Sequence, residues 1–118
     1  MAKGQAERLF PLIDAVMTEA GVTYADLDGI AVTVGPGSFT GTRLGIATAR
    51  GLALATGLPV YGASSLACIA ARARRQSPDI AADLPLLVCH DARRGQVYAQ
   101  LFGAFDQPPL SEPRLVAV

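Results

Sequence analysis

The chain has 118 residues, 51% of them hydrophobic, which is enough for one ordinary domain with a buried core. Its ten basic and ten acidic residues cancel, so the chain as a whole lacks the positive field with which proteins hold nucleic acid by neutralising phosphates. We therefore expect any contact with nucleic acid to be made mainly by a partner protein.

No stretch of the sequence is typical of a membrane span or a secretion signal. Arg, Asp, Gly or Pro interrupts the apolar runs well before the roughly 20 residues that a bilayer requires. This predicts a cytoplasmic protein without a membrane segment. Cys68 and Cys89 lie far apart, each in an apolar run, which indicates reduced, buried thiols and not a disulfide or a zinc site.

Near the start of the chain, apolar residues recur at steps of three and four. They are Leu9, Leu12, Ile13, Val16 and Ala20. The spacing predicts an amphipathic helix from about Ala6 to Ala20, ended by Gly21. Pro11 favours a late start, because a proline is best tolerated in the first turn of a helix.

The next segment predicts a strand, a tight loop and a second helix. Ile30–Val34 is rich in β-branched residues, as in a strand buried on both faces of a parallel sheet. Gly35–Ser38 suits a tight loop, and Ser38 can cap a helix over about Phe39–Thr56. A short strand, Val60–Ala63, follows.

Ser64 or Ser65 can cap a third helix that runs to about Gln76. After this helix, Ser77–Asp83 contains a proline and two aspartates with little apolar pattern. We expect a linker and a domain boundary in this segment.

Two strands, Leu84–His90 and Gln96–Phe102, are predicted beyond the linker, joined by a hairpin at Asp91–Gly95. A last apolar run begins at Arg114. The order of elements predicts the α/β class. Because a parallel sheet needs strands on both sides of a buried member, we also expect that a segment preceding residue 1 is missing.

The strand, glycine loop and helix at Val32–Arg50 have the order of a phosphate-binding site. A P-loop requires a lysine after its last glycine, however, and the only lysine of the chain is Lys3. The dinucleotide pattern fails as well, because Gly41 comes one residue late and no acid ends the strand at Val60–Ala63. Nucleotide binding at this loop is the weaker interpretation.

Small residues recur every four positions along the second helix. They are Gly41, Gly45, Ala49, Ala53 and Gly57. Glycine inside a helix costs roughly 0.5 to 1 kcal/mol relative to alanine, so such a stripe needs a packing reason. The spacing alone fits close contact with a partner helix or with the chain's own sheet equally well.

His90 and Asp91 are candidates for an acid/base pair or a metal site. One histidine and one carboxylate are too few for the common zinc arrangements, and adjacent strand residues point to opposite faces. Asp91 is better explained as a turn residue, and Arg93 and Arg94 as surface charges of the hairpin. We assign no catalytic residue, no metal ligand and no cofactor.

The run Gly35–Gly45 reads Gly-Pro-Gly-Ser-Phe-Thr-Gly-Thr-Arg-Leu-Gly and resembles the signature of the TsaB family. Ala6–Ile13 and Asp91–Tyr98 agree with the same family in order. The signature positions are Gly35, Pro36, Gly37, Ser38, Phe39, Thr40, Gly41, Arg43, Gly45, Asp91 and Arg93. The resemblance covers essentially the whole chain, which is similar to about the middle half of a family member and is truncated at both ends.

The resemblance implies an incomplete actin-like (ribonuclease H-like) fold. Residues 1–80 would be the later part of the first actin-like domain. Residues 84–118 would be the opening strands of the second.

The resemblance also implies a non-catalytic scaffold or activator of TsaD, the paralogue that transfers threonylcarbamoyl to adenosine in tRNA. TsaD carries paired histidines on its first helix, which this chain lacks. Implied partners are a TsaD-type subunit, a TsaE-type ATPase and a second copy of the chain, with tRNA contacted only indirectly. The implied interface comprises Leu9, Leu12, Ile13, Val16, Gly41, Gly45, Ala49 and Ala53, because the first two helices of the family form a bundle with TsaD.

Two other functions stay open at this point. The first is an ATP-dependent enzyme of the actin-like superfamily, in which Asp91 and the Gly35–Ser38 loop would meet phosphates and magnesium. The second is a homodimeric interaction module that uses the same helical faces.

Overall fold

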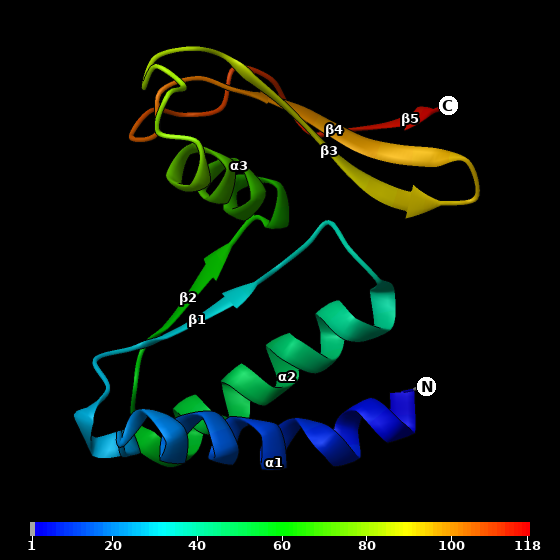
Figure 1. Cartoon of the computed structure of the whole chain (residues 1–118). Helices are drawn as coiled ribbons and strands as arrows, with labels where there is room; N and C mark the ends of the chain where they lie inside the picture. Colours follow the sequence, from blue (N-terminus) through cyan, green and yellow to red (C-terminus); the bar gives the residue numbers. More distant parts are fainter. Residues whose placement is uncertain (1) are drawn as a thin grey trace. The chain divides into compact units, whose positions relative to one another are not determined.

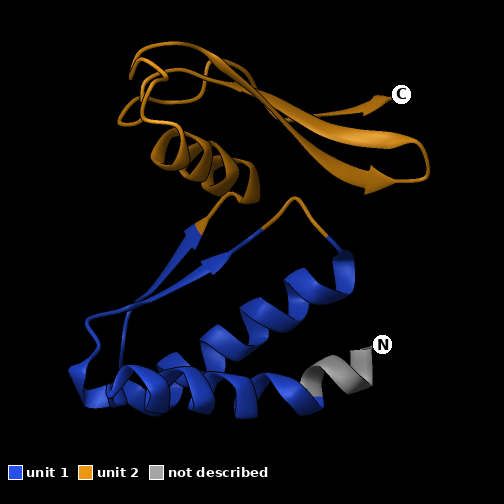
Figure 2. Ribbon diagram, in the orientation of Figure 1, with its two compact units in different colours: residues 1–34, 38–62 blue, residues 35–37, 63–118 orange. Residues whose placement is uncertain are grey.

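The computed structural model describes residues 2–118 and contains three α-helices, one short 3-10 helix and five strands in this range (Figure 1). The elements are α1 (Ala2–Ala20), η1 (Tyr24–Asp26), β1 (Ile30–Thr33), α2 (Phe39–Thr56), β2 (Val60–Ala63), α3 (Ser65–Gln76), β3 (Leu86–Arg93), β4 (Gln96–Phe102) and β5 (Arg114–Ala117). They form two compact units, residues 1–34 with 38–62 and residues 35–37 with 63–118 (Figure 2). No described helix is long and apolar enough to cross a membrane.

The first unit contains a two-stranded sheet and two helices. β1 and β2 run in the same direction in Figure 1, and the Ile30 amide donates a hydrogen bond of 2.9 Å to the Pro59 carbonyl. α2 packs on β1, and α1 packs on α2. The central position of α2 explains why this helix is rich in small residues, because it must approach a sheet and another helix at once.

Local capping signals set the bounds of α2, which agree with the prediction from the sequence. The Ser38 hydroxyl accepts a hydrogen bond of 3.0 Å from the Gly41 amide, as an N-cap residue should. Gly57 ends the helix at φ 75°, a left-handed conformation that favours glycine. The prediction of β2 over Val60–Ala63 is also confirmed.

The expected late start of the first helix was wrong, because α1 begins at Ala2 and contains Pro11 in its interior. A proline at this position removes one helical hydrogen bond to the carbonyl four residues earlier, that of Glu7. Both Pro11 and Glu7 are exposed, so water can bond to that carbonyl. This makes an internal proline tolerable here.

The second unit is an antiparallel sheet in the order β3-β4-β5, with α3 against one face. The register pairs Leu86 with Phe102, and Tyr98 with both His90 and Leu115. The core of this unit consists of Leu66 and Ala70 of α3, Val88 of β3 and Phe102 of β4. Leu66 is fully buried, which identifies α3 as the element that covers the sheet.

The units divide after Gly62, upstream of the boundary that we expected at Ser77–Asp83. The reason is α3, which packs on β3 and β4 and so belongs with the second sheet. The expected linker is a pair of turns closed by hydrogen bonds from Ile80 to Ser77 and from Leu84 to Ala81. The assignment of residues 1–80 and 84–118 to two actin-like domains stays a prediction.

The expectation of buried thiols was wrong, because Cys68 and Cys89 are free but exposed. Cys68 lies on the side of α3 that faces away from the core. Cys89 follows the buried Val88 in β3 and therefore points to the face of the sheet that α3 leaves open. An apolar run does not tell which face of a sheet will be covered.

Candidate partner-binding surface

The apolar stripe of α1 is wider than the area that the chain itself covers. Leu9, Ile13 and Met17 form the half-buried centre of the stripe. On one flank, Leu12 and Val16 are 59% and 64% exposed. They lie one helical turn apart and therefore form a continuous apolar ridge. We call Leu12 and Val16 the α1 ridge.

Beside the α1 ridge lies a groove between α1 and α2, with a volume of about 340 Å³. Its lining residues are Arg8, Leu9, Leu12, Gly41, Leu44 and Gly45. Gly41 and Gly45 contribute no side chains, which leaves the groove open, and Leu9, Leu12 and Leu44 make it apolar. The structure thus brings together four of the residues predicted for the interface: Leu9, Leu12, Gly41 and Gly45.

Part of the small-residue stripe, Gly45 included, also packs toward the chain's own sheet. A β-carbon built on Gly45 would lie 3.5 Å from Cγ2 of Val32 in β1. Ala49 is only 4% exposed, and Ala53 is half-buried. Ala49 therefore has almost no surface to offer a partner, and packing within the unit explains this part of the stripe.

A second face of α2 is exposed and was not singled out by the sequence analysis. Phe39 is 74% exposed and Leu54 is 90% exposed. The guanidinium of Arg43 lies over the Phe39 ring, 4.7 Å from its centre, as in a cation–π pair. The spacing of Phe39 and Arg43, four residues apart in a helix, is the signal that could have revealed this contact.

The signature loop Gly35–Gly37 has a local structural role in the second unit. Gly35 adopts φ 106°, which only glycine tolerates well, and its carbonyl accepts a hydrogen bond of 3.0 Å from the Ser65 amide. The loop thus contacts the beginning of α3. Phe39, Thr40 and Arg43 of the signature are exposed on α2.

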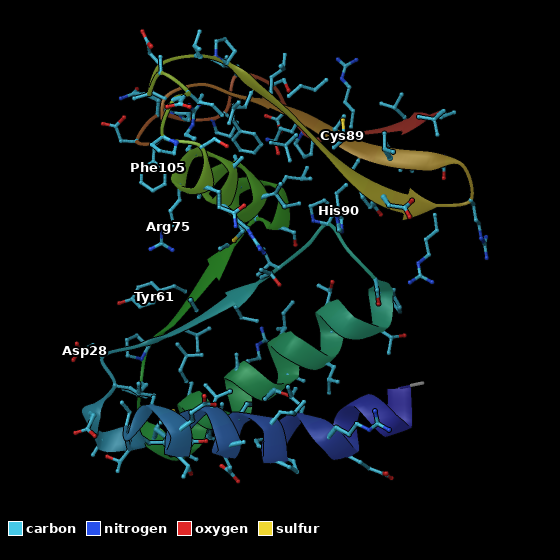
Figure 3. The ribbon with its side chains drawn as sticks, viewed as in Figure 1. Asp28, Tyr61, Arg75, Cys89, His90 and Phe105 are labelled. Carbon is cyan, nitrogen blue, oxygen red and sulfur yellow. The ribbon has the colours of Figure 1, made fainter. Side chains whose placement is uncertain are left out.

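Asp91 lies near the end of β3, and its side chain bonds to the backbone close to the hairpin turn. Its Oδ1 accepts a hydrogen bond of 2.8 Å from the Arg93 amide, and Arg93 and Arg94 have positive φ angles of 67° and 54°. His90 and Cys89 project from opposite sides of β3 (Figure 3). Asp91 follows His90 in the same strand and therefore points to the opposite face from His90. Among the described residues no group of three or more His, Cys, Asp or Glu could hold a metal ion.

Comparisons with known proteins identify the class of this chain. Residues 1–107 match the model of the family described as tRNA N6-adenosine threonylcarbamoyltransferase, TsaD. The chain belongs to this family of actin-like proteins. Within it the chain is TsaB/YeaZ-like, because it is 39% identical to the tRNA threonylcarbamoyladenosine biosynthesis protein TsaB of Escherichia coli over 92 residues, 78% of this chain and 38% of that protein.

A solved structure supports the same class. YeaZ from Pseudomonas aeruginosa superposes with a TM-score of 0.81 at 32% identity, covering 95% of this chain and 52% of that chain. A protein of Erythrobacter litoralis named tRNA N6-adenosine threonylcarbamoyltransferase is 51% identical over 65 residues, 55% of this chain and 19% of that protein. The chain therefore spans about half, or less, of the length of these relatives.

Proposed function

We propose that this chain takes part in forming threonylcarbamoyladenosine in tRNA as a non-catalytic subunit that binds a TsaD-type catalytic subunit through α1 and α2. The observation that carries the proposal is the α1 ridge beside an open apolar groove. Leu12 and Val16 are more than half exposed, and Leu12 also lines the groove with Gly41 and Gly45. An apolar ridge beside glycines is the arrangement into which another helix packs closely.

The relatives support the choice of partner. TsaB of E. coli is named for biosynthesis of threonylcarbamoyladenosine in tRNA, and the matching family is named for the transferase. The chain has no histidine on α1, where the resemblance places the metal ligands of TsaD. A role beside the catalytic subunit, with most of the tRNA contact made by that subunit, fits both facts.

The first experiment is co-purification of the chain with the TsaD-type subunit of the same organism. We expect a complex of defined mass by size exclusion with light scattering. A chain that forms only homodimers, and never a mixed complex, would favour the interaction-module alternative.

Titration with Mg-ATP in a calorimeter separates the proposal from the ATP-dependent enzyme. The Gly35 carbonyl accepts a hydrogen bond from the Ser65 amide at the beginning of α3, and the Asp91 carboxylate accepts one from the nearby Arg93 amide. No lysine follows the glycine loop. We expect no binding by the isolated chain tighter than about 10 µM, which corresponds to about −7 kcal/mol. Tighter binding would argue for the enzyme.

A further inference from the structure

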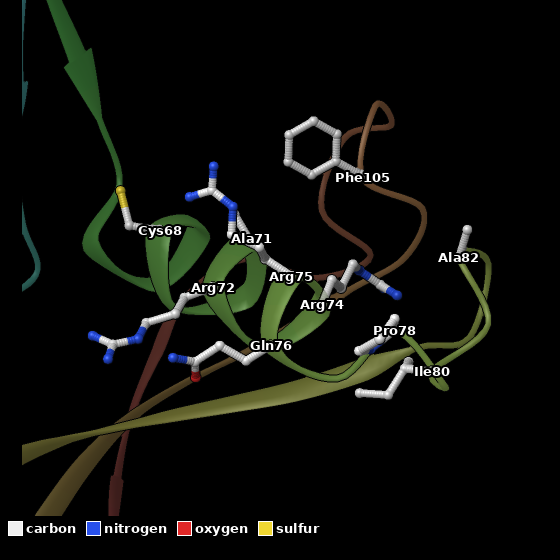
Figure 4. A pocket seen from close by; sticks show the side chains of 10 residues that line it. All are labelled: Cys68, Ala71, Arg72, Arg74, Arg75, Gln76, Pro78, Ile80, Ala82 and Phe105. Carbon is white, nitrogen blue, oxygen red and sulfur yellow. The ribbon is translucent and has the colours of Figure 1, made fainter.

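A wide cleft at the end of α3, within the second unit, is not used by the proposed function. Its volume is about 970 Å³, and its lining includes Arg72, Arg74, Arg75, Gln76 and Phe105 (Figure 4). None of the lining residues is acidic. The charged residues of the lining are thus all arginines, while Asp79, Asp83 and Asp106 adjoin lining residues in the sequence without lining the cleft themselves.

Arg74 builds the walls of this cleft. Its guanidinium donates hydrogen bonds to the carbonyls of Ala81, Leu84 and Gly103, at 3.3, 2.8 and 2.6 Å. These bonds attach two separate loops to the last turns of α3. Arg74 therefore stabilises the positions of the two loops that form the cleft with α3.

Unlike Arg74, which is half-buried, Arg72 and Arg75 are exposed to solvent. They leave α3 in different directions, and the ring of Phe105 lies on the Arg75 side (Figure 4). Phe105 is 75% exposed, in a turn closed by the hydrogen bond from Gln107 to Ala104. An exposed aromatic ring on the same side of a helix as an exposed guanidinium group, with a second guanidinium farther along the cleft, is a combination with which proteins bind unpaired nucleotides. The ring stacks on a base and the cations neutralise phosphates.

We infer that the α3 cleft binds an unpaired RNA segment, with Arg72 and Arg75 at phosphates and Phe105 stacked on a base. This inference rests on the proposed function, which places the chain in an assembly that acts on tRNA, and it adds a local, direct contact to the contact made by the partner.

The test is fluorescence anisotropy of a labelled, unpaired RNA oligonucleotide titrated with the 118-residue chain. We expect Phe105→Ala to weaken binding about five- to hundredfold and Phe105→Tyr to restore it, since stacking on an aromatic ring contributes roughly 1 to 3 kcal/mol per base. Replacing Arg72 and Arg75 by Gln should lower the slope of log K against log salt by about 1.4 in magnitude, because each phosphate contact to a single strand contributes about 0.7.

The matched control replaces Arg93 and Arg94 by Gln, which removes the same charge from the hairpin of the same unit. An equal loss of RNA binding in this control and in the Arg72/Arg75 variant would overturn the inference, as would binding that is insensitive to Phe105. Displacement of the RNA by an acidic peptide that itself binds independently of Phe105 would identify a protein partner instead. The cleft variants should still co-purify with the TsaD-type subunit. Loss of the RNA-binding inference alone would therefore leave this co-purification intact, whereas failure of the proposed function would abolish it in the wild-type chain as well.

Discussion

Gly45 of α2 lies directly against Val32 of β1, since a β-carbon on Gly45 would be 3.5 Å from Cγ2 of Val32. This is an ordinary van der Waals distance for a methyl group, but a longer side chain on Gly45 would have to displace Val32 or turn into the groove between α1 and α2. We expect Gly45→Leu to lower the free energy of unfolding by about 1 to 3 kcal/mol, the usual cost of overpacking. Urea denaturation followed by circular dichroism measures the change.

Two control variants make this prediction specific. Gly45→Ala fits the available space and should stabilise α2 by roughly 0.5 to 1 kcal/mol. Gly51 lies on the same helix, and a β-carbon added there meets nothing within 4 Å. Gly51→Leu should therefore be tolerated. If Gly51→Leu destabilised the chain as much as Gly45→Leu, the packing of Gly45 on β1 would not be the cause.

Arg74 should stabilise the second unit out of proportion to its position near the surface. Arg74→Ala removes the bonds to Ala81, Leu84 and Gly103, and we expect a loss of about 1 to 3 kcal/mol. Arg74→Lys should recover little, because a single ammonium cannot reproduce the guanidinium fork. Arg75→Ala is the control, with an expected change within about 0.5 kcal/mol. Thermal unfolding of the wild type and the three variants measures these differences in stability.

The Thr23–Asp26 pair at η1 predicts a measurable pKa effect. The backbone amide and the hydroxyl of Thr23 donate hydrogen bonds of 2.9 and 3.0 Å to Asp26 Oδ2 and hold the pKa of this carboxyl below its ordinary value. The folded pKa is thus below the unfolded one, so the stabilisation is present above the unfolded pKa of about 3.9 and is lost as the pH falls through the folded pKa. NMR titration should show that Thr23→Ala raises the pKa only in part, because the amide remains. An unchanged pKa in this variant would exclude a contribution from the hydroxyl.

The 118-residue chain by itself should self-associate. The α1 ridge, Leu12 and Val16, is exposed to solvent. On the open face of the second sheet, the paired residues Leu87 and Leu101 are 65% and 40% exposed. Exposed apolar surface costs on the order of 25 cal/mol per Å², and open sheet edges are templates for another chain. Light scattering over a concentration series should give a mass that rises with concentration. A compact monomer that unfolds cooperatively would contradict this expectation.

Local signals made α2 and β2 predictable, whereas long-range contacts determined what the sequence could not show. The bounds of α2 follow from Ser38 and Gly57, both of which act within a few residues. The grouping of α3 with the second sheet depends on contacts such as the bond from Arg74 to Gly103, between residues that are distant in the sequence. No periodicity reveals such a pair.

For the candidate partner-binding surface, too, the sequence predicted some features, and only the structure could reveal the others. The apolar spacing of α1 predicted the stripe correctly, but the spacing could not tell that Leu12 and Val16 lie on its uncovered flank. The stripe of small residues in α2 was ambiguous between a partner and the chain's own sheet. Val32 and the burial of Ala49 account for its packing within the unit, while Gly41 and Gly45 also line the groove.

The most direct test of the central claim compares two exposed faces of the first unit in their effect on binding to the TsaD-type subunit. Leu12→Asp and Val16→Asp place a charge on the α1 ridge, whereas Leu54→Asp makes the same change on the far side of α2, where the side chain is 90% exposed. By isothermal titration calorimetry, we predict that each ridge variant raises Kd at least about tenfold, a loss of about 1.4 kcal/mol, and that Leu54→Asp changes it less than about twofold. Unchanged binding in the ridge variants, or a larger loss with Leu54→Asp, would contradict the assignment of α1 and α2 as the partner-binding surface.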